Sequence, residues 1–155
     1  MKMVKKDHVM KENILIDGPV THKMIASILE ALGNDTGAGG HSSFLGQVRA
    51  DGTGGKRVKA IEYSAYEAMV QEEAEKIKKS VLTEYDDLKS IKILHSTGIV
   101  KAGEISLFVL VSAGHRHQAI EACSKIVEMI KENLPVWKKE IFEDNTSEWR
   151  QNYQA

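Results

Sequence analysis

The stretch I-S-L-F-V-L-V-S at residues 105–112 decides the fold of this chain. It is continuous, apolar and rich in β-branched and aromatic residues, which predicts a buried strand. A glycine break follows, and the basic run H-R-H at residues 115–117 opens a predicted helix. That helix continues to about residue 133, because Pro135 cannot extend it. The segment V-W-K-K-E-I-F then predicts one more strand.

Upstream of the central strand, predicted strands and helices alternate. Strands are expected at residues 13–17, 41–50, 57–63 and 90–95, and helices at residues 21–32 and 65–82. The run D-G-T-G-G predicts a hairpin turn that pairs the strands on its two sides, and residues 98–103 predict a second turn. Helices and strands interleave without strict βαβ repetition. This order favours an α+β fold with a largely antiparallel sheet.

The two upstream helices have apolar stripes. Thr21 is the expected N-cap of the first helix, whose stripe contains Ile25, Ile28, Leu29 and Leu32. The stripe of the second helix contains Tyr66, Met69, Val70, Ala74, Ile77 and Val81. Its charged residues predict a solvated face: Glu72, Glu73, Glu75, Lys76, Lys78 and Lys79.

Composition limits the classes of function. The chain has 155 residues, is 42% hydrophobic and 28% charged, and has a formal net charge of −1. We expect a single domain over residues 1–155, with residues 1–11 flexible. The net charge argues against nucleic-acid binding, and no apolar run reaches the ~20 residues of a membrane span. A soluble cytoplasmic protein is expected.

The cysteine count limits the chemistry further. Cys123 is the single cysteine, so neither an intramolecular disulfide nor a cysteine-based zinc site can form. It falls beside Ile120, Ile126 and Val127 on the expected packed face of its helix. We interpret it as a small core residue rather than a nucleophile, and we expect no metal site.

The sequence G-H-R-H at residues 114–117 predicts an anion site. Free backbone N–H groups at a helix N-terminus favour negative charge. Here His115, Arg116 and His117 add positive charge, which opposes the helix dipole unless an anion lies among them. The alternative is that the histidines cap or pack the helix and that Arg116 is a surface side chain.

Lys131 and Lys138 predict a second cationic site. Each is ordinary taken alone, because the helix dipole favours a lysine in the last turn and exposed lysines beside aromatic residues are common. Pro135, however, reverses the chain between them. Two ammonium groups brought close together, and partly dried by Trp137, would have lowered pKa values and could act as acid, base or nucleophile.

Four segments together resemble the large, catalytic subunit of molybdopterin synthase. They are S-A-G-H-R-H-Q-A-I-E-A, L-P-V-W-K-K-E, G-G-H-S-S-F-L-G-Q-V-R and I-E-Y-S-A-Y-E-A-M, the last being similar to the family's L-E-Y-E-A-Y-x-P-M. The resemblance covers roughly residues 39–149 with the spacings preserved. The expected fold class is therefore α+β, with a mostly antiparallel sheet, interleaved helices and an α/β-hammerhead-like arrangement.

The resemblance implies a sulfur transferase of molybdenum cofactor biosynthesis. Such an enzyme converts a cyclic pyranopterin monophosphate (precursor Z) into molybdopterin. The sulfur comes from the C-terminal Gly-Gly thiocarboxylate of a small ubiquitin-like carrier subunit. No tightly bound cofactor is implied, and two large subunits flanked by two carriers would form a heterotetramer.

The resemblance also assigns residues. It implies that Lys131 and Lys138 are catalytic, Lys131 by positioning the thiocarboxylate and by a covalent or acid–base role, Lys138 as the second acid–base group. It implies that Arg49, His115 and Arg116 hold the phosphate and the pterin, with Phe44 as a pocket-lining aromatic. Anionic substrates suit these cationic residue types.

Helix geometry adds a prediction about assembly. His115 and Lys131 are sixteen residues apart, hence ~24 Å at 1.5 Å per residue, which is longer than a pterin monophosphate. If both act on one substrate, they must come from different chains. We therefore expect a C2 homodimer with shared sites.

Two alternative functions remain from the residues alone. The first is a non-catalytic dimeric module whose basic cluster binds a phosphate or a nucleotide. The second is an enzyme that forms a Schiff base between Lys131 and a carbonyl substrate without a protein partner.

Overall fold

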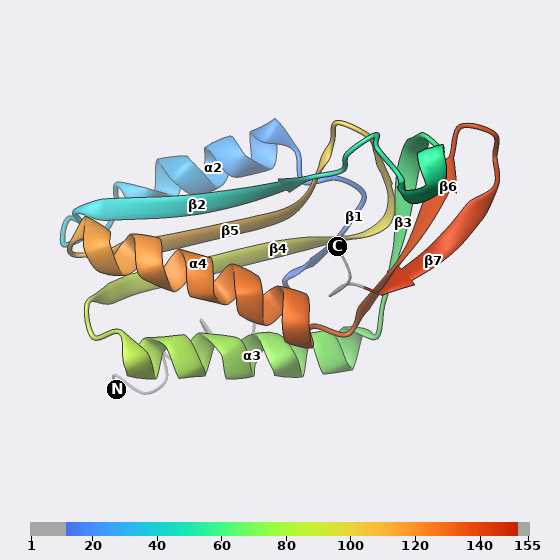
Figure 1. The fold of residues 1–155 in the computed structure, drawn as a ribbon. Coiled ribbons are helices and arrows are strands. Elements are labelled where there is room, and N and C mark those ends of the chain that lie inside the picture. Colours follow the sequence, from blue (N-terminus) through green and yellow to red (C-terminus); the bar gives the residue numbers. More distant parts are fainter. Residues whose placement is uncertain (1–11, 152–155) are drawn as a thin grey trace.

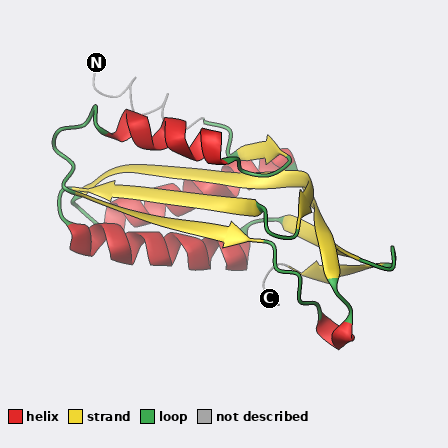
Figure 2. Ribbon diagram, turned by 90° about the horizontal axis from the view of Figure 1, so that it is seen from above, coloured by secondary structure: helices red, strands yellow, loops and turns green. Residues whose placement is uncertain are grey.

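The computed structural model describes residues 12–151 as one curved sheet with helices on both faces (Figures 1 and 2). In this part of the chain the sheet has seven strands, in the order β2-β5-β4-β3-β6-β7, with β1 added beside β4. All neighbouring strands are antiparallel except β1 and β4. The predicted α+β fold with a mostly antiparallel sheet is confirmed. The segment expected to be flexible, residues 1–11, lies outside the described residues.

The central strand is β5 (Ile105–Ala113), and every one of its residues is buried. Leu107, Val109 and Val111 face the main core, under α3 (Glu67–Glu84) and α4 (Arg116–Asn133). Phe108 and Leu110 face a smaller core under α2 (His22–Leu32). Because helices cover both faces of this strand, its sequence is continuously apolar rather than alternating.

The strand β4 (Leu88–Lys101) is longer than expected and belongs to both parts of the sheet. Its first part pairs with β5, and its last residues pair with β3 (Val58–Ala65). Gly98 separates the two parts with a φ of 76°, in the left-handed region that favours glycine. The predicted turn at residues 98–103 therefore begins too early. The bend turns β3, β6 and β7 away from the long strands (Figure 1).

The pairing of β2, the extent of β1 and the presence of β7 differ from the prediction. The strand β2 (Gly40–Gln47) pairs with β5, whereas β3 pairs with β4 and with β6 (Val136–Phe142). The turn near residues 51–55 forms, with one bridge between Asp51 and Arg57, but the predicted hairpin pairing of β2 with β3 is wrong. The observed partner of β2 is β5, a strand whose residues are all buried. A strand that the sequence patterns do not predict, β7 (Ser147–Gln151), pairs with β6. The predicted strand at 13–17 shortens to β1 (Leu15–Asp17).

The helices begin and end close to the predicted residues. The Thr21 side chain accepts a hydrogen bond from the backbone N–H of Met24 at 3.2 Å, which confirms the N-cap of α2. His115 is the N-cap of α4, and Pro135 follows the end of that helix. No helix in the described part of the chain is long and apolar enough to cross a membrane.

Some predicted helix faces were wrong. Cys123 is buried as expected, but Ile120 is 57% exposed, so it does not belong to the packed face of α4. Lys78, which was placed on the solvated face of α3, is buried, and desolvation lowers its pKa. Three residues of the predicted apolar stripes are exposed: Leu29, Tyr66 and Met69. Single-helix periodicity gives the direction of a face but not its width.

Candidate active site

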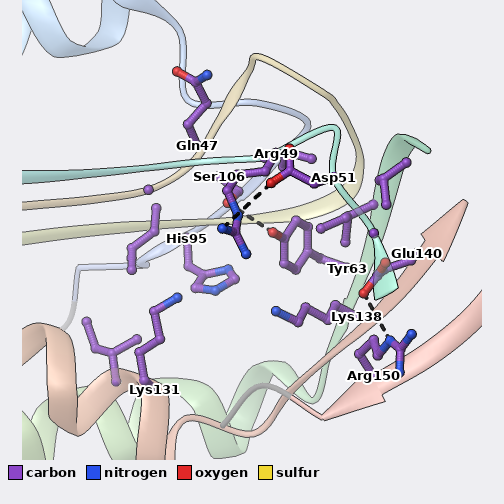
Figure 3. Close-up of a pocket in the computed structure, with 17 residues that line it drawn as sticks. Gln47, Arg49, Asp51, Tyr63, His95, Ser106, Lys131, Lys138, Glu140 and Arg150 are labelled. Atoms are coloured by element: carbon purple, nitrogen blue, oxygen red, sulfur yellow. Dashed lines mark hydrogen bonds and ion pairs between the residues drawn. The ribbon is translucent and has the colours of Figure 1, made fainter. Parts of the chain in front are cut away.

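A cavity lies where the sheet bends, between the C-terminal end of α4 and the strands β3, β6 and β7 (Figure 3). It has a volume of about 420 Å³. Lys131 enters it from the last turn of α4, and Lys138 enters it from β6. Arg49, just after β2, and Arg150, on β7, also line it. The chain thus gathers four basic side chains from four segments around one cavity.

Strand register explains why Lys138 faces the cavity. Lys138 lies opposite Tyr63 on β3 and Arg150 on β7, and side chains opposite one another share a face of the sheet. Trp137 precedes it on β6, so it points to the other face, and it is 48% exposed. The expectation that Trp137 dries Lys138 is therefore wrong. Burial within the cavity desolvates Lys138 instead.

The pKa of Lys138 is lowered, as the sequence analysis expected. Burial is the largest cause, and the positive charge of Lys131 is the second. Arg49 and Arg150 also lower it, whereas the carboxylate of Glu140 raises it. An amine with a lowered pKa gives up and takes back a proton more readily at neutral pH, which suits acid–base chemistry.

Glu140 contributes the negative charge in the cavity wall. Its Oε1 accepts a hydrogen bond from Arg150 Nε at 3.0 Å. Its Oε2 is buried and accepts no hydrogen bond in the described structure. The carboxylate therefore fixes the Arg150 guanidinium and stays close enough to Lys138 to act on its pKa.

Sequence reasoning missed several polar residues of the cavity, among them His95 and Tyr63. His95 lies on β4, is 4% exposed, and lines the cavity. The Tyr63 hydroxyl donates a hydrogen bond to Ser106 Oγ at 3.0 Å. A signal for His95 was present, because it continues the alternating positions 91 and 93 of a predicted strand. Tyr63 could be placed in the cavity only from the register of β3 with β6, which sets it opposite Lys138.

The remaining predicted site residues lie outside this cavity. His115 and Arg116 are at the other end of α4, and both are exposed. Phe44 lies on β2, half-buried against the main core. It approaches the cavity only through Gly46, a lining residue near its ring. Within one chain the structure thus brings together Lys131, Lys138 and Arg49 alone.

The basic helix N-terminus already has an anion, Asp87. Its Oδ2 accepts hydrogen bonds from the His115 backbone N–H at 2.8 Å and from His115 Nδ1 at 2.9 Å. These bonds lower the pKa of Asp87, the side-chain bond being the largest cause. A Cβ on Gly114 would lie 2.4 Å from Asp87 Oδ1, so glycine is required for this approach. The sequence pattern predicts an anion beside His115, and in the structure this anion is the Asp87 carboxylate of the same chain.

The described residues contain no group of three or more His, Cys, Asp or Glu that could hold a metal ion. Cys123 is buried away from the cavity, and desolvation raises the pKa of its thiol. A buried thiol with a raised pKa is a poor nucleophile. Lys131 and Lys138, which line the cavity, carry amines that can do covalent or acid–base work.

Comparison with known proteins gives a consistent family. A family model described as "MoaE protein" matches residues 19–133. The chain is 39% identical over 124 residues to the molybdopterin synthase catalytic subunit of Dictyostelium discoideum, covering 79% of this chain and 78% of that protein. It is 37% identical over 150 residues to the Drosophila melanogaster protein of the same name, covering 96% of this chain. It spans only 38% of the length of that protein.

Solved structures agree with the fold. Molybdopterin synthase from Staphylococcus aureus has a TM-score of 0.78 and 28% identity, with 90% of this chain and 97% of that chain covered. A protein–protein complex of subunits 1 and 2 of molybdopterin-converting factor from Helicobacter pylori has a TM-score of 0.74. At 21% identity over 88% of each chain, this second likeness shows the fold alone.

Proposed function

This chain belongs to the MoaE protein family, and from that premise we propose that it is the catalytic subunit of a molybdopterin synthase. The proposed reaction converts a cyclic pyranopterin monophosphate into molybdopterin by sulfur transfer. The name of the Dictyostelium relative, which the chain matches over most of both lengths, supports this proposal. The Staphylococcus structure supports it independently.

The observation that carries the proposal is the cavity with Lys131 and Lys138 together. Both substrates are anions, because the pterin brings a phosphate and the carrier brings a thiocarboxylate. Lys131, Lys138, Arg49 and Arg150 give the cavity a concentration of positive charge in a chain whose formal net charge is −1. Charge-assisted hydrogen bonds from such groups are the strong ones, so the cavity suits both anions.

The proposed chemistry needs proton transfer at two points. The thiocarboxylate sulfur attacks a carbon of the pterin side chain and forms a thioester between carrier and substrate, while an oxygen leaves that carbon. Water then hydrolyses the thioester, which leaves one sulfur on the substrate and a carboxylate on the carrier. A second thiocarboxylated carrier repeats both steps at the neighbouring carbon, because the dithiolene has two sulfurs. Lys131 positions the thiocarboxylate, and Lys138, with its lowered pKa, gives a proton to the leaving oxygen and takes one from the water.

The remaining predicted residues enter through a second copy of the chain. α4 is one continuous helix between the cavity and Arg116, so sixteen residues separate His115 from Lys131, or ~24 Å. We propose a C2 homodimer in which His115 and Arg116 of one protomer reach the cavity of the other. Phe44 is proposed as an aromatic wall beside Gly46. The two-subunit Helicobacter complex supports a small partner subunit, here the sulfur carrier, and hence a heterotetramer.

Neither a resident cofactor nor a metal is part of this proposal, since the carrier delivers the sulfur and the chain's own residues move the protons. We also propose the cytoplasm as the place of the reaction. A lone, buried cysteine fits a reducing compartment of this kind.

The test is conversion of the cyclic precursor by the purified chain with a thiocarboxylated carrier, followed by detection of the dithiolene product. Wild type should convert the precursor, and Lys131→Ala should not. A carrier ending in an ordinary carboxylate is the matched control, and it should give no product. Binding of the precursor without any conversion would favour the phosphate-binding module instead. Conversion of small carbonyl compounds without a carrier would favour a Schiff-base enzyme.

A further inference from the structure

His95 is a buried histidine whose tautomer the structure determines. Its Nδ1 lies 2.9 Å from the backbone carbonyl oxygen of Ser96. A carbonyl oxygen only accepts hydrogen bonds, so Nδ1 must carry the proton. In the neutral ring, Nε2 then carries the lone pair and can accept a hydrogen bond.

The ring of His95 is held in place at the cavity wall. Tyr63 packs against it edge to face, with ring centroids 5.4 Å apart and an interplanar angle of 82°. The Tyr63 hydroxyl is engaged with Ser106 and leaves the imidazole to other partners. Figure 3 shows the imidazole between the amino ends of Lys131 and Lys138. A fixed acceptor thus lies between the two cations of the site.

The surroundings keep this imidazole uncharged. Burial lowers the pKa of His95 to about 4, and the positive charges of Lys131 and Lys138 lower it as well. The other charged groups of the cavity are Arg49 after β2, Asp51, Glu140 on β6 and Arg150 on β7. At neutral pH the imidazole is therefore an acceptor without charge.

The two lysines differ in the partners that surround them. Lys138 has the Glu140 carboxylate among the charges that act on it. In the described part of the chain, no ion pair joins Lys131 to a carboxylate. Of the two lysines, Lys131 has the larger effect on the pKa of His95. An acceptor with no negative charge can hold an ammonium group in place and still leave its positive charge available to an anion.

We propose that His95 positions Lys131: its Nε2 accepts a hydrogen bond from the Lys131 ammonium group and holds that group in the cavity for the anionic thiocarboxylate. This inference rests on the proposed function. A carboxylate in the same place would neutralise Lys131, whereas the imidazole orders it and keeps the cavity cationic. His95 acts through Lys131, so it is a positioning residue.

Two variants separate this role from simple packing. His95→Asn keeps an amide that can donate to the Ser96 carbonyl, but its side chain is too short to reach the position of Nε2. His95→Gln places an amide oxygen near the position of Nε2 and restores the acceptor. The control is His41→Asn, because His41 also makes a single hydrogen bond, to Ser112 Oγ at 2.8 Å, and does not line the cavity.

The first measurement is the kinetics of conversion with the thiocarboxylated carrier. We expect His95→Asn to lower kcat by about tenfold to a hundredfold, as loss of a hydrogen bond to a charged group does, with KM for the pterin nearly unchanged. His95→Gln should recover most of kcat, and His41→Asn should match wild type. The inference is overturned if His95→Asn is as fast as wild type, or if Asn and Gln variants of equal thermal stability are equally slow.

The second measurement does not need activity. Nitrogen NMR of the wild-type chain should show His95 neutral with a proton on Nδ1, and the Lys131 ammonium protected from solvent exchange. That protection should be lost in His95→Asn and kept in His95→Gln. An inactive wild type would remove the proposed function and leave this readout intact. A Lys131 signal that exchanges freely in wild type would overturn the positioning role, whatever the activity.

Discussion

Lys131 and Lys138 reach one cavity from two different elements, with the ring of His95 between their amino ends (Figure 3). Seven residues separate them along the chain, and Pro135 lies in the short connection. The proximity of the lysines follows from that connection, whereas their common direction follows from the pairing of β6 with β3.

The first prediction concerns stability. Lys138→Met should raise Tm at pH 7, by about 2–4 °C for each kcal/mol of relieved desolvation in a domain of this size, and should slow conversion strongly. The pKa of Lys138 is lower in the folded than in the unfolded chain, so the folded state binds fewer protons between that lowered pKa and 10.5. Wild-type stability therefore rises with pH in this window, and the advantage of Lys138→Met should shrink. If the difference in Tm between wild type and Lys138→Met stayed constant between pH 7 and 10.5, the lowered pKa of Lys138 would be contradicted.

The second prediction concerns Glu140, whose charge raises the pKa of Lys138. Glu140→Gln should lower that pKa further and move the corresponding midpoint of the pH–rate profile to lower pH. Glu148→Gln is the matched control, because Glu148 also contacts Arg150, at 3.2 Å, but does not line the cavity. Equal shifts in both variants would mean that the profile does not report Lys138.

The third prediction concerns the start of α4. Asp87→Asn should lower Tm at pH 7, because the carboxylate accepts two hydrogen bonds from His115 at the helix N-terminus. The pKa of Asp87 lies below 3.8, so its contribution is complete above that pH and is lost as the pH falls through the lowered value. Melting curves of the two proteins should therefore converge in acid. Asp86→Asn, on the neighbouring residue, is the control, and an equal loss of Tm would contradict the assignment to Asp87.

The fourth prediction concerns the shared sites of the proposed dimer. Lys131→Ala and Arg116→Ala should each be inactive alone. Mixed and allowed to exchange subunits, they should regain about a quarter of wild-type activity, since half of the dimers are mixed and each has one intact site. A mixture that stays inactive, although mass spectrometry of the native complex detects mixed dimers, would show that the two ends of α4 do not serve one site.

Much of the fold follows from local patterns in the sequence. The apolar run in β5 predicts a strand buried on both faces, and helix signals place α2 and α4 to within a residue. The failures are long-range. β2 lies at one end of the strand order beside β5, far from β3, because pairing depends on which apolar faces meet and not on chain proximity. β7 lacks an alternating apolar pattern, and it is stabilised by its register with β6.

The candidate site was also predictable only where local sequence features identify its residues. Lys131, Lys138 and Arg49 follow from charge, position and family resemblance, and the structure brings them together. Glu140 and Arg150 needed the register of β6 with β7, which no local signal specifies. To predict that His95 lines the cavity, one needs both the alternation of side chains along β4 and the position of α4 opposite that strand. The proposed roles of His115, Arg116 and Phe44 stay predictions that a single chain does not test.

The most direct test compares two adjacent lysines, Lys138 and Lys139. Lys139 lies on the same strand, faces the opposite side of the sheet and pairs with Glu62 at 3.1 Å. In single-turnover conversion with the thiocarboxylated carrier, Lys138→Ala should be slower than wild type by about 10²–10⁴-fold, the usual contribution of acid–base catalysis. Lys139→Ala should convert the precursor at nearly the wild-type rate. Equal rates for the two variants would contradict the claim that the cationic cavity is where sulfur is transferred.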